Sequence, residues 1–118
     1  MKGSMKLILI PGLLVLLSGA AHAEILPKSI RGLWGFEAAD CASPGSDGLL
    51  KIGANTVTFF ASAHDIKRVV RRSDGSLIAS GFVSNEGEQG RDPGSLTLKR
   101  ITPDKLHVLD HIYHRCPN

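Results

Sequence analysis

The chain has 118 residues and carries 14 Lys and Arg side chains against 11 Asp and Glu, for a net charge of +3. A chain of this length forms one domain at most. Lys2 and Lys6 lie in a segment that we expect to be removed, which leaves 12 basic against 11 acidic side chains. This near-neutral balance argues against a nucleic-acid partner.

The N-terminus has the three parts of a secretory signal peptide. Lys2 and Lys6 give it a positive start, and an apolar run follows at residues 7–17. Ala21 and Ala23 then supply small side chains at the −3 and −1 positions of a cleavage site. The apolar run is shorter than the roughly 20 residues that a membrane-spanning helix needs.

We therefore expect a signal peptide at residues 1–23, cut after Ala23, and a single domain at residues 24–118. The protein is predicted to be periplasmic or secreted, and not membrane-spanning. Both cysteines, Cys41 and Cys116, lie in the expected domain. In an exported chain an even number of cysteines predicts a disulfide, and two cysteines allow one pairing.

The expected domain consists of short segments rich in β-branched and aromatic residues, separated by turn signals such as Asp74-Gly75. This pattern is typical of all-β folds. We predict a small antiparallel β-barrel or sandwich of about seven to eight strands with one disulfide. The expected strands are 30–37, 48–52, 55–62, 65–73, 76–85, 95–101 and 105–116.

A short helix near residues 63–72 is the alternative at one place. Ser62 stands three residues before Asp65, as in a capping box, and Ile66, Val69 and Val70 follow at helical spacing. The flanking segments are β-like and the segment runs into a hairpin turn, so we favour a strand.

The segment 105–116 contains three histidines and Cys116, which raises the question of a metal site. On one continuous strand, Val108, Ile112 and Cys116 share a face, and His111 and His114 point in opposite directions. A zinc site that includes Cys116 would also need it as a thiolate, which a disulfide removes. We therefore expect no metal ligands and no cofactor.

Charged residues supply the candidate partner-binding positions. One group lies in the predicted strand 65–73, where Lys67 and Arg71 would share one face and Arg68 and Arg72 the other. Charges on a solvated strand edge also have the simpler role of blocking edge pairing. The phenylalanines nearest to this run are predicted to belong to the core; they are Phe59, Phe60 and Phe82.

A second group lies in the loop 85–94, where we single out Glu86, Glu88 and Arg91. On a strand, Glu86 and Glu88 would face the same side, as an acid/base pair of a glycosidase requires. They flank Gly87 at a glycine-rich loop, where solvated carboxylates are ordinary. We therefore predict no catalytic residues.

The stretch RGLWG places Gly32 and Trp34 in a G-x-W on the first expected strand. It resembles the opening of lipocalin-like barrels, in which the Trp closes the base of the barrel and a late Arg stacks over it. The resemblance implies that Arg115 or Arg100 makes this cation–π contact here.

The wider frame of IRGLWG, Cys41, SNEGE, DKL and YHRC resembles small exported bacterial lipocalin-like β-barrel proteins. That resemblance implies a small antiparallel barrel with tied chain ends, and no activity. True lipocalins are far longer and hold a roomy pocket, whereas a barrel of this size can be filled by its own side chains.

Periplasmic inhibitors of c-type lysozyme provide a second, architectural resemblance, because they are small, exported, disulfide-tied barrels. Their inhibitory loops carry S-G-x-x-Y-type motifs. The nearest match here is Ser80-Gly81-Phe82-Val83, which lacks the Tyr.

We predict a non-enzymatic binding module that contacts an envelope or host protein, or an invading hydrolase, through loops such as 85–94. The alternative is a lipocalin-like carrier of a small apolar ligand. The carrier is excluded if side chains fill the barrel; those expected inside are Leu33, Phe36, Ile52, Val57, Phe59, Val70, Ile78 and Leu98.

Overall fold

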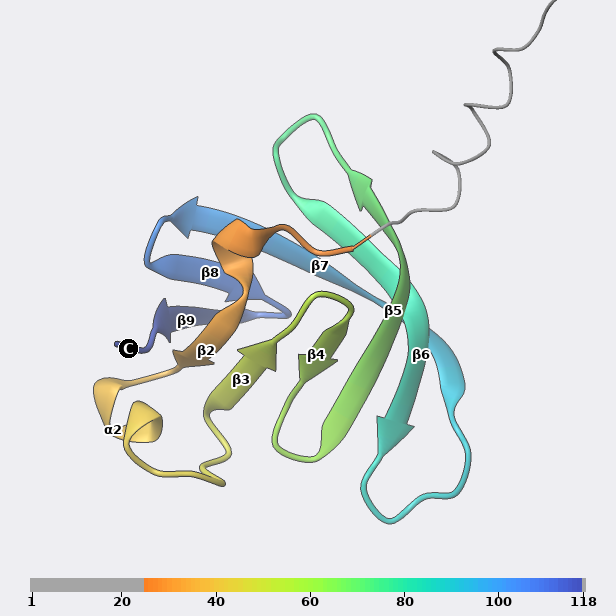
Figure 1. Ribbon diagram of the computed structural model, residues 1–118, viewed down its shortest axis with the longest axis horizontal. Coiled ribbons are helices and arrows are strands. Elements are labelled where there is room, and N and C mark those ends of the chain that lie inside the picture. The colour runs from red at the N-terminus through yellow and green to blue at the C-terminus, as the bar shows by residue number, and fades with distance from the viewer. Residues whose placement is uncertain (1–24, 118) are drawn as a thin grey trace, which may run out of the picture.

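The computed structural model describes residues 25–117, so the expected signal peptide and its cleavage site lie outside the described residues. Eight antiparallel strands form a closed barrel in which every strand pairs with its neighbours in sequence and β2 pairs with β9 (Figure 1). This confirms the all-β class and selects the barrel over the sandwich. The elements are η1 (Lys28–Ile30), β2 (Gly32–Gly35), α2 (Ala38–Cys41), β3 (Leu49–Ile52), β4 (Thr56–Thr58), β5 (Ser62–Arg71), β6 (Leu77–Asn85), β7 (Asp92–Thr102), β8 (Lys105–Val108) and β9 (His111–Arg115).

The closing pair of strands is short. Only Trp34 with Arg115 and Gly35 with His114 are in register between β2 and β9. No hairpin joins these two strands, because they lie at opposite ends of the barrel's strand order. The Cys41–Cys116 disulfide ties α2, which follows β2, to the residue after β9. The predicted disulfide is therefore confirmed, and it lies beside the closing seam.

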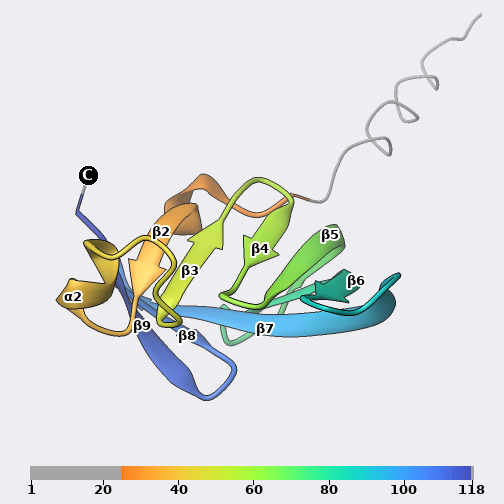
Figure 2. The same cartoon turned by 90° about the horizontal axis from the view of Figure 1, so that it is seen from below.

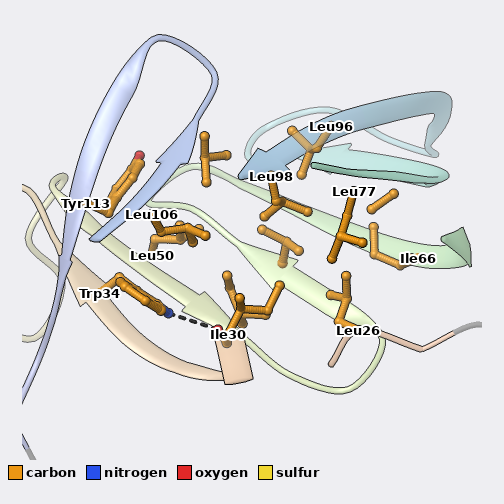
Figure 3. Close-up of a cluster of buried hydrophobic side chains, with 14 residues drawn as sticks. Leu26, Ile30, Trp34, Leu50, Ile66, Leu77, Leu96, Leu98, Leu106 and Tyr113 are labelled. Carbon is orange, nitrogen blue, oxygen red and sulfur yellow. Dashed lines mark hydrogen bonds between the residues drawn. The ribbon is translucent and has the colours of Figure 1, made fainter. Parts of the chain in front are cut away.

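The barrel interior is filled by side chains from all eight strands and from the segment before β2 (Figure 3). Trp34 is the largest of the fully buried side chains. The buried core consists of Leu26, Ile30, Trp34, Leu50, Ile52, Val57, Ile66, Leu77, Ala79, Leu96, Leu98, Leu106, Val108 and Tyr113.

The segment predicted as a strand or a short helix lies in strand β5 (Ser62–Arg71), which contains a β-bulge. The register between β5 and β6 shifts between Ile66 and Arg68. Opposite the bulge, a Cβ atom at Gly81 would lie 1.9 Å from the carbonyl oxygen of Asp65, so only glycine fits there. A bulge reverses the inside–outside alternation of the residues that follow it.

This reversal explains two wrong expectations. Val70 was expected inside the barrel but is 42% exposed, while Val69 packs against the core. Lys67 and Arg71 were also expected on one face. Lys67 is exposed and pairs with Asp65, whereas Arg71 is two residues after Val69, in the series of β5 residues that face the interior.

Simple alternation accounts for two further errors. Trp34 and Leu77 are buried, so their neighbours Leu33 and Ile78 are not: Leu33 is exposed and Ile78 is only partly buried.

Phe60 and Phe82 were expected in the core, and both are exposed. Ile52, Val57 and Leu98 lie in the core, with Phe36 and Phe59 packed partly buried against it.

The segment 105–116 was expected as one strand and forms two. β8 and β9 make a hairpin whose turn contains Leu109 in a left-handed conformation, with φ of 58°. The turn breaks the predicted alternation, so Tyr113 is buried, whereas Ile112 is exposed. The expected face shared by Val108, Ile112 and Cys116 therefore does not exist.

The longest strand, β7, links two parts of the barrel wall (Figure 2). Residues 92–98 of β7 pair with β6, and residues 98–102 pair with β8. The connections between strands lie at two opposite ends of the barrel. The β5–β6 and β7–β8 turns and η1 lie at one end, and the β4–β5 and β6–β7 connections lie at the other (Figure 1).

Candidate functional site

The residues that the sequence assigned to barrel closure lie together at the η1 end. The guanidinium carbon of Arg115 is 4.2 Å from the centroid of the Trp34 ring, so Arg115 and not Arg100 makes the cation–π contact. The indole nitrogen of Trp34 donates a hydrogen bond of 2.9 Å to the carbonyl oxygen of Ile30 (Figure 3). This satisfies the single polar atom of an otherwise apolar side chain.

Arg115 also ties β9 to two other backbone segments, η1 with its C-cap and the β7–β8 turn. Its guanidinium donates hydrogen bonds to the carbonyl oxygens of Ser29, Arg31 and Pro103. Gly32 is needed for its backbone conformation, a φ of 123°, which residues with a side chain rarely adopt; a Cβ there would make only an ordinary contact of 3.6 Å with the guanidinium. The contacts of Gly32, Trp34 and Arg115 are internal ones that hold η1 against the seam, and they offer little to a partner.

One member of the basic run of β5 is held by an ion pair within the barrel wall. Lys67 pairs with Asp65 at 3.2 Å, and Arg91 from the β6–β7 connection pairs with the same carboxylate at 3.0 Å. Arg91 also lies 4.5 Å above the centroid of the Phe82 ring. Arg91, singled out as a partner-binding residue, therefore pins the β6–β7 connection to the barrel wall. The hydrogen bond from Lys67 and the bond from Arg91 hold the pKa of Asp65 below its usual value.

Glu86 and Glu88 lie in a turn and not on a strand, because β6 ends at Asn85. The backbone N–H of Glu86 donates to the carbonyl oxygen of Ala61, and that of Glu88 donates to Asn85. Among the described residues neither carboxylate has an ion-pair partner. Both remain available to a positively charged group outside this chain.

Phe60 is a candidate functional residue that the sequence interpretation missed. It lies between β4 and β5, and 58% of its surface is exposed. A backbone bond from Phe59 N–H to the carbonyl oxygen of Ser62 closes the turn and leaves the Phe60 side chain outside. The Glu86–Ala61 hydrogen bond fixes this turn beside the β6–β7 connection.

A shallow groove runs along each side of Phe60. The first is about 300 Å³ and is lined by Ala63, Ser84 and Glu86 with the β4–β5 turn. The second is about 290 Å³ and is lined by Leu33, Leu49 and Lys51 with the same turn. We call Phe60 and these two grooves the Phe60 surface.

The sequence contained a weak signal for this surface. The pair Phe59-Phe60 follows Thr56-Val57-Thr58, and strict alternation can place only one of two adjacent aromatics inside a barrel. Phe59 is the one that packs against the core. The stretch Ser80-Gly81-Phe82-Val83 lies within β6 and pairs with β5 and β7 on its two sides, so it is no loop.

The histidines do not converge. Among residues 25–117, no group of three or more His, Cys, Asp and Glu side chains is placed to hold a metal ion. His64 packs edge-on against Phe59, with ring centroids 5.6 Å apart, and its burial lowers its pKa. His111 lies 4.8 Å from the Phe36 ring.

The lowered pKa values of three aspartates lead us to expect that the stability of the fold depends on pH. Hydrogen bonds from Ser46 to Asp40, from Lys67 to Asp65 and from Ser76 to Asp74 lower the three pKa values below 3.8. A lowered folded-state pKa stabilises the protein above the unfolded pKa, and this is lost as pH falls through the folded value. Urea unfolding should therefore show lower stability at pH 3 than at pH 7.

The triple variant Asp40→Asn/Asp65→Asn/Asp74→Asn is the control, and its stability should change less between the two pH values. Equal changes in the variant and in the wild type would show that these three groups do not carry the effect.

Comparison of the chain with protein-family models, with curated proteins and with solved structures gives no match. Within residues 25–117, no helix has the length and apolar character that crossing a membrane requires. The Cys41–Cys116 disulfide indicates an oxidising compartment. The fold and the site together define a small, closed, disulfide-tied β-barrel with an exposed aromatic at one end.

Proposed function

We propose that the protein is an exported, non-enzymatic binding module that contacts a protein partner through the Phe60 surface. The observation that carries this proposal is the exposure of Phe60 between two grooves, on a turn held by backbone hydrogen bonds. Aromatic side chains dominate the energetics of protein interfaces, where they insert into pockets of the partner. An exposed aromatic on loops held by a rigid scaffold is typical of such an anchor.

The charges around Phe60 favour a partner with a basic surface. Glu86 lines one groove, Lys51 lines the other, and Glu88 is in the same connection as Glu86. Without internal partners, the two glutamates attract a basic surface and increase the rate of encounter with it. The proposed partner is an envelope or host protein, or an invading hydrolase, with an apolar cleft bordered by Lys or Arg.

The alternative function, a carrier of a small apolar ligand inside the barrel, is less well supported. The side chains of the core pack into the interior from all eight strands (Figure 3). A ligand of lipocalin size needs a cavity of about 300–1,000 Å³ lined by interior side chains. The grooves of that size beside Phe60 lie on the outer surface and are open to solvent.

Export is part of the proposal and has its own test. The signal-peptide pattern at residues 1–23 and the disulfide both support export from the cytoplasm. We expect the intact mass of the protein from the periplasm or medium to correspond to a chain beginning at Glu24. A mass that retains residues 1–23 would contradict cleavage.

The binding surface is tested by comparative capture from envelope extract. Wild type, Phe60→Ser and Ile101→Ser are immobilised, and the eluted proteins are compared. Ile101 is 51% exposed in β7 next to the β7–β8 turn, so its variant loses a similar apolar area elsewhere. We expect a protein that binds wild type and Ile101→Ser but is reduced at least about tenfold for Phe60→Ser, the usual loss at an interface anchor.

A further immobilised variant, Glu86→Gln/Glu88→Gln, tests how the two acidic side chains contribute to partner binding. This variant should retain the partner at low salt but bind it more slowly, and the rate should depend less on ionic strength. Capture that does not differ between wild type and Phe60→Ser would contradict the proposed surface.

A further inference from the structure

A second feature lies at the other end of the barrel, where η1 meets the β5–β6 and β7–β8 turns (Figure 1). A pocket of about 160 Å³ opens there. Buried apolar side chains of Ile30, Leu77, Leu98 and Leu106 form its floor. Arg71 and Arg100 form its rim, and we call it the Arg71–Arg100 pocket.

Both arginines occupy positions that belong to the inward-facing series of their strands. In β7, Leu96 and Leu98 are buried and Arg100 is the next residue in the series. In β5, the bulge turns Val69 inward, and Arg71 is two residues further. Arg71 is in register with buried Leu77, and Arg100 with buried Leu106.

The positive charge of this rim is not neutralised within the described residues. Neither Arg71 nor Arg100 has a carboxylate partner or a side-chain hydrogen bond there. The acidic groups of the two adjacent turns are engaged elsewhere: Asp74 accepts hydrogen bonds from Ser76, and Asp104 lies 3.8 Å from Arg115. Both arginines also border a second, open pocket on the outer side.

We propose that the Arg71–Arg100 pocket binds a small carboxylic acid with a short apolar tail or an aromatic ring. Guanidinium groups recognise carboxylates through charge-assisted, bidentate hydrogen bonds. The apolar floor takes the tail, and the volume sets its size, because a cavity of about 150 Å³ accommodates benzene. The site therefore fits a tail of roughly six carbons. It lies at the opposite end from the Phe60 surface and does not depend on it.

Titration of the purified protein with sodium hexanoate, followed by two-dimensional amide NMR, tests the proposal. The protein has a single Trp, so one indole N–H signal reports on Trp34, whose acceptor is the carbonyl of pocket residue Ile30. We expect saturable shifts in that signal and in the amides of residues 75–77 and 98–100. A uniform drift, or no shift at hexanoate concentrations up to tens of millimolar, overturns the proposal.

A chain-length series separates a defined pocket from general adsorption of apolar compounds. From acetate to hexanoate we expect the affinity to rise about threefold per carbon, as partial burial of each CH₂ requires. From hexanoate to decanoate it should change little, because the tail has left the pocket. A continued rise to decanoate, or equal binding of 1-hexanol and hexanoate, overturns the proposal.

Matched variants test whether Arg71 and Arg100 bind the carboxylate of hexanoate. Arg71→Gln and Arg100→Gln should each weaken hexanoate binding about fivefold or more, as expected for the loss of a charge-assisted hydrogen bond at a solvated rim. Arg68→Gln removes another exposed charge from the same strand and should leave the affinity unchanged. Equal losses in all three variants would show a general electrostatic effect and overturn the assigned site.

Discussion

Replacing Trp34 with alanine is expected to lower the free energy of unfolding by about 4 kcal/mol, near the middle of the range for a buried aromatic. Trp34 is fully buried, is paired with Arg115 across the closing seam, and bonds to the carbonyl of Ile30. Its removal leaves a cavity beneath Arg115 and leaves a buried carbonyl without its donor. Urea unfolding followed by far-UV circular dichroism measures the change.

Trp34→Phe separates packing from the hydrogen bond. It keeps an aromatic ring beneath Arg115 and loses the indole N–H, so a smaller loss of about 1–2 kcal/mol is expected. If Trp34→Ala were nearly as stable as wild type, Trp34 would not close the barrel.

Removing the disulfide should have an effect of similar size. The Cys41–Cys116 bond closes a loop between two cysteines that are 75 positions apart in the sequence. The chain-entropy model gives about 4.5 kcal/mol for such a loop, an upper figure. The double variant Cys41→Ala/Cys116→Ala is therefore expected to lose about 4 kcal/mol, a large share of the roughly 5–15 kcal/mol typical of a domain.

The same urea experiment on wild-type protein with and without reductant provides the control. Reduced wild type should unfold near the midpoint of the double variant, and reductant should not affect the variant. Oxidised and reduced wild type with the same midpoint would show that the bond does not stabilise the fold. The effect is expected to be large because the β2–β9 seam has only two residue pairs in register.

The parts of the fold that the sequence predicted depend on local patterns. Turn residues and β-branched runs recur at short spacing, and this was enough to predict an antiparallel all-β fold, with the choice between a barrel and a sandwich left to the structure. The disulfide followed from the two cysteines of an expected exported chain. The G-x-W resemblance placed Trp34 and Arg115 in contact, although it left Arg100 open as the alternative.

The errors arose where a residue's face depends on a partner strand. The bulge in β5 exists because Gly81 of β6 allows the close approach of Asp65, and strand β5 alone gives no sign of it. Val70 was therefore assigned to the wrong face. The β8–β9 turn was missed because it has no Gly, and Leu109 adopts the left-handed conformation instead.

The candidate site was only partly predictable for the same reason. The β6–β7 loop was identified from its glycines and charges, yet Arg91 turns out to pair with Asp65 from β5. Phe60 was assigned to the core because an aromatic in a β-rich segment is most often buried. Its exposure follows from the bend that separates β4 from β5, and the Phe59–Ser62 bond that closes this bend was visible only in the structure.

The most direct test of the Phe60 surface is photocrosslinking in the cells that export the protein. A photoreactive phenylalanine analogue is placed at position 60 and, as the matched control, at exposed position 101. We predict a single light-dependent product of defined mass at position 60, absent at position 101, that excess wild type suppresses and excess Phe60→Ser does not. No product at position 60, or the same products at both positions, would contradict a partner at this surface.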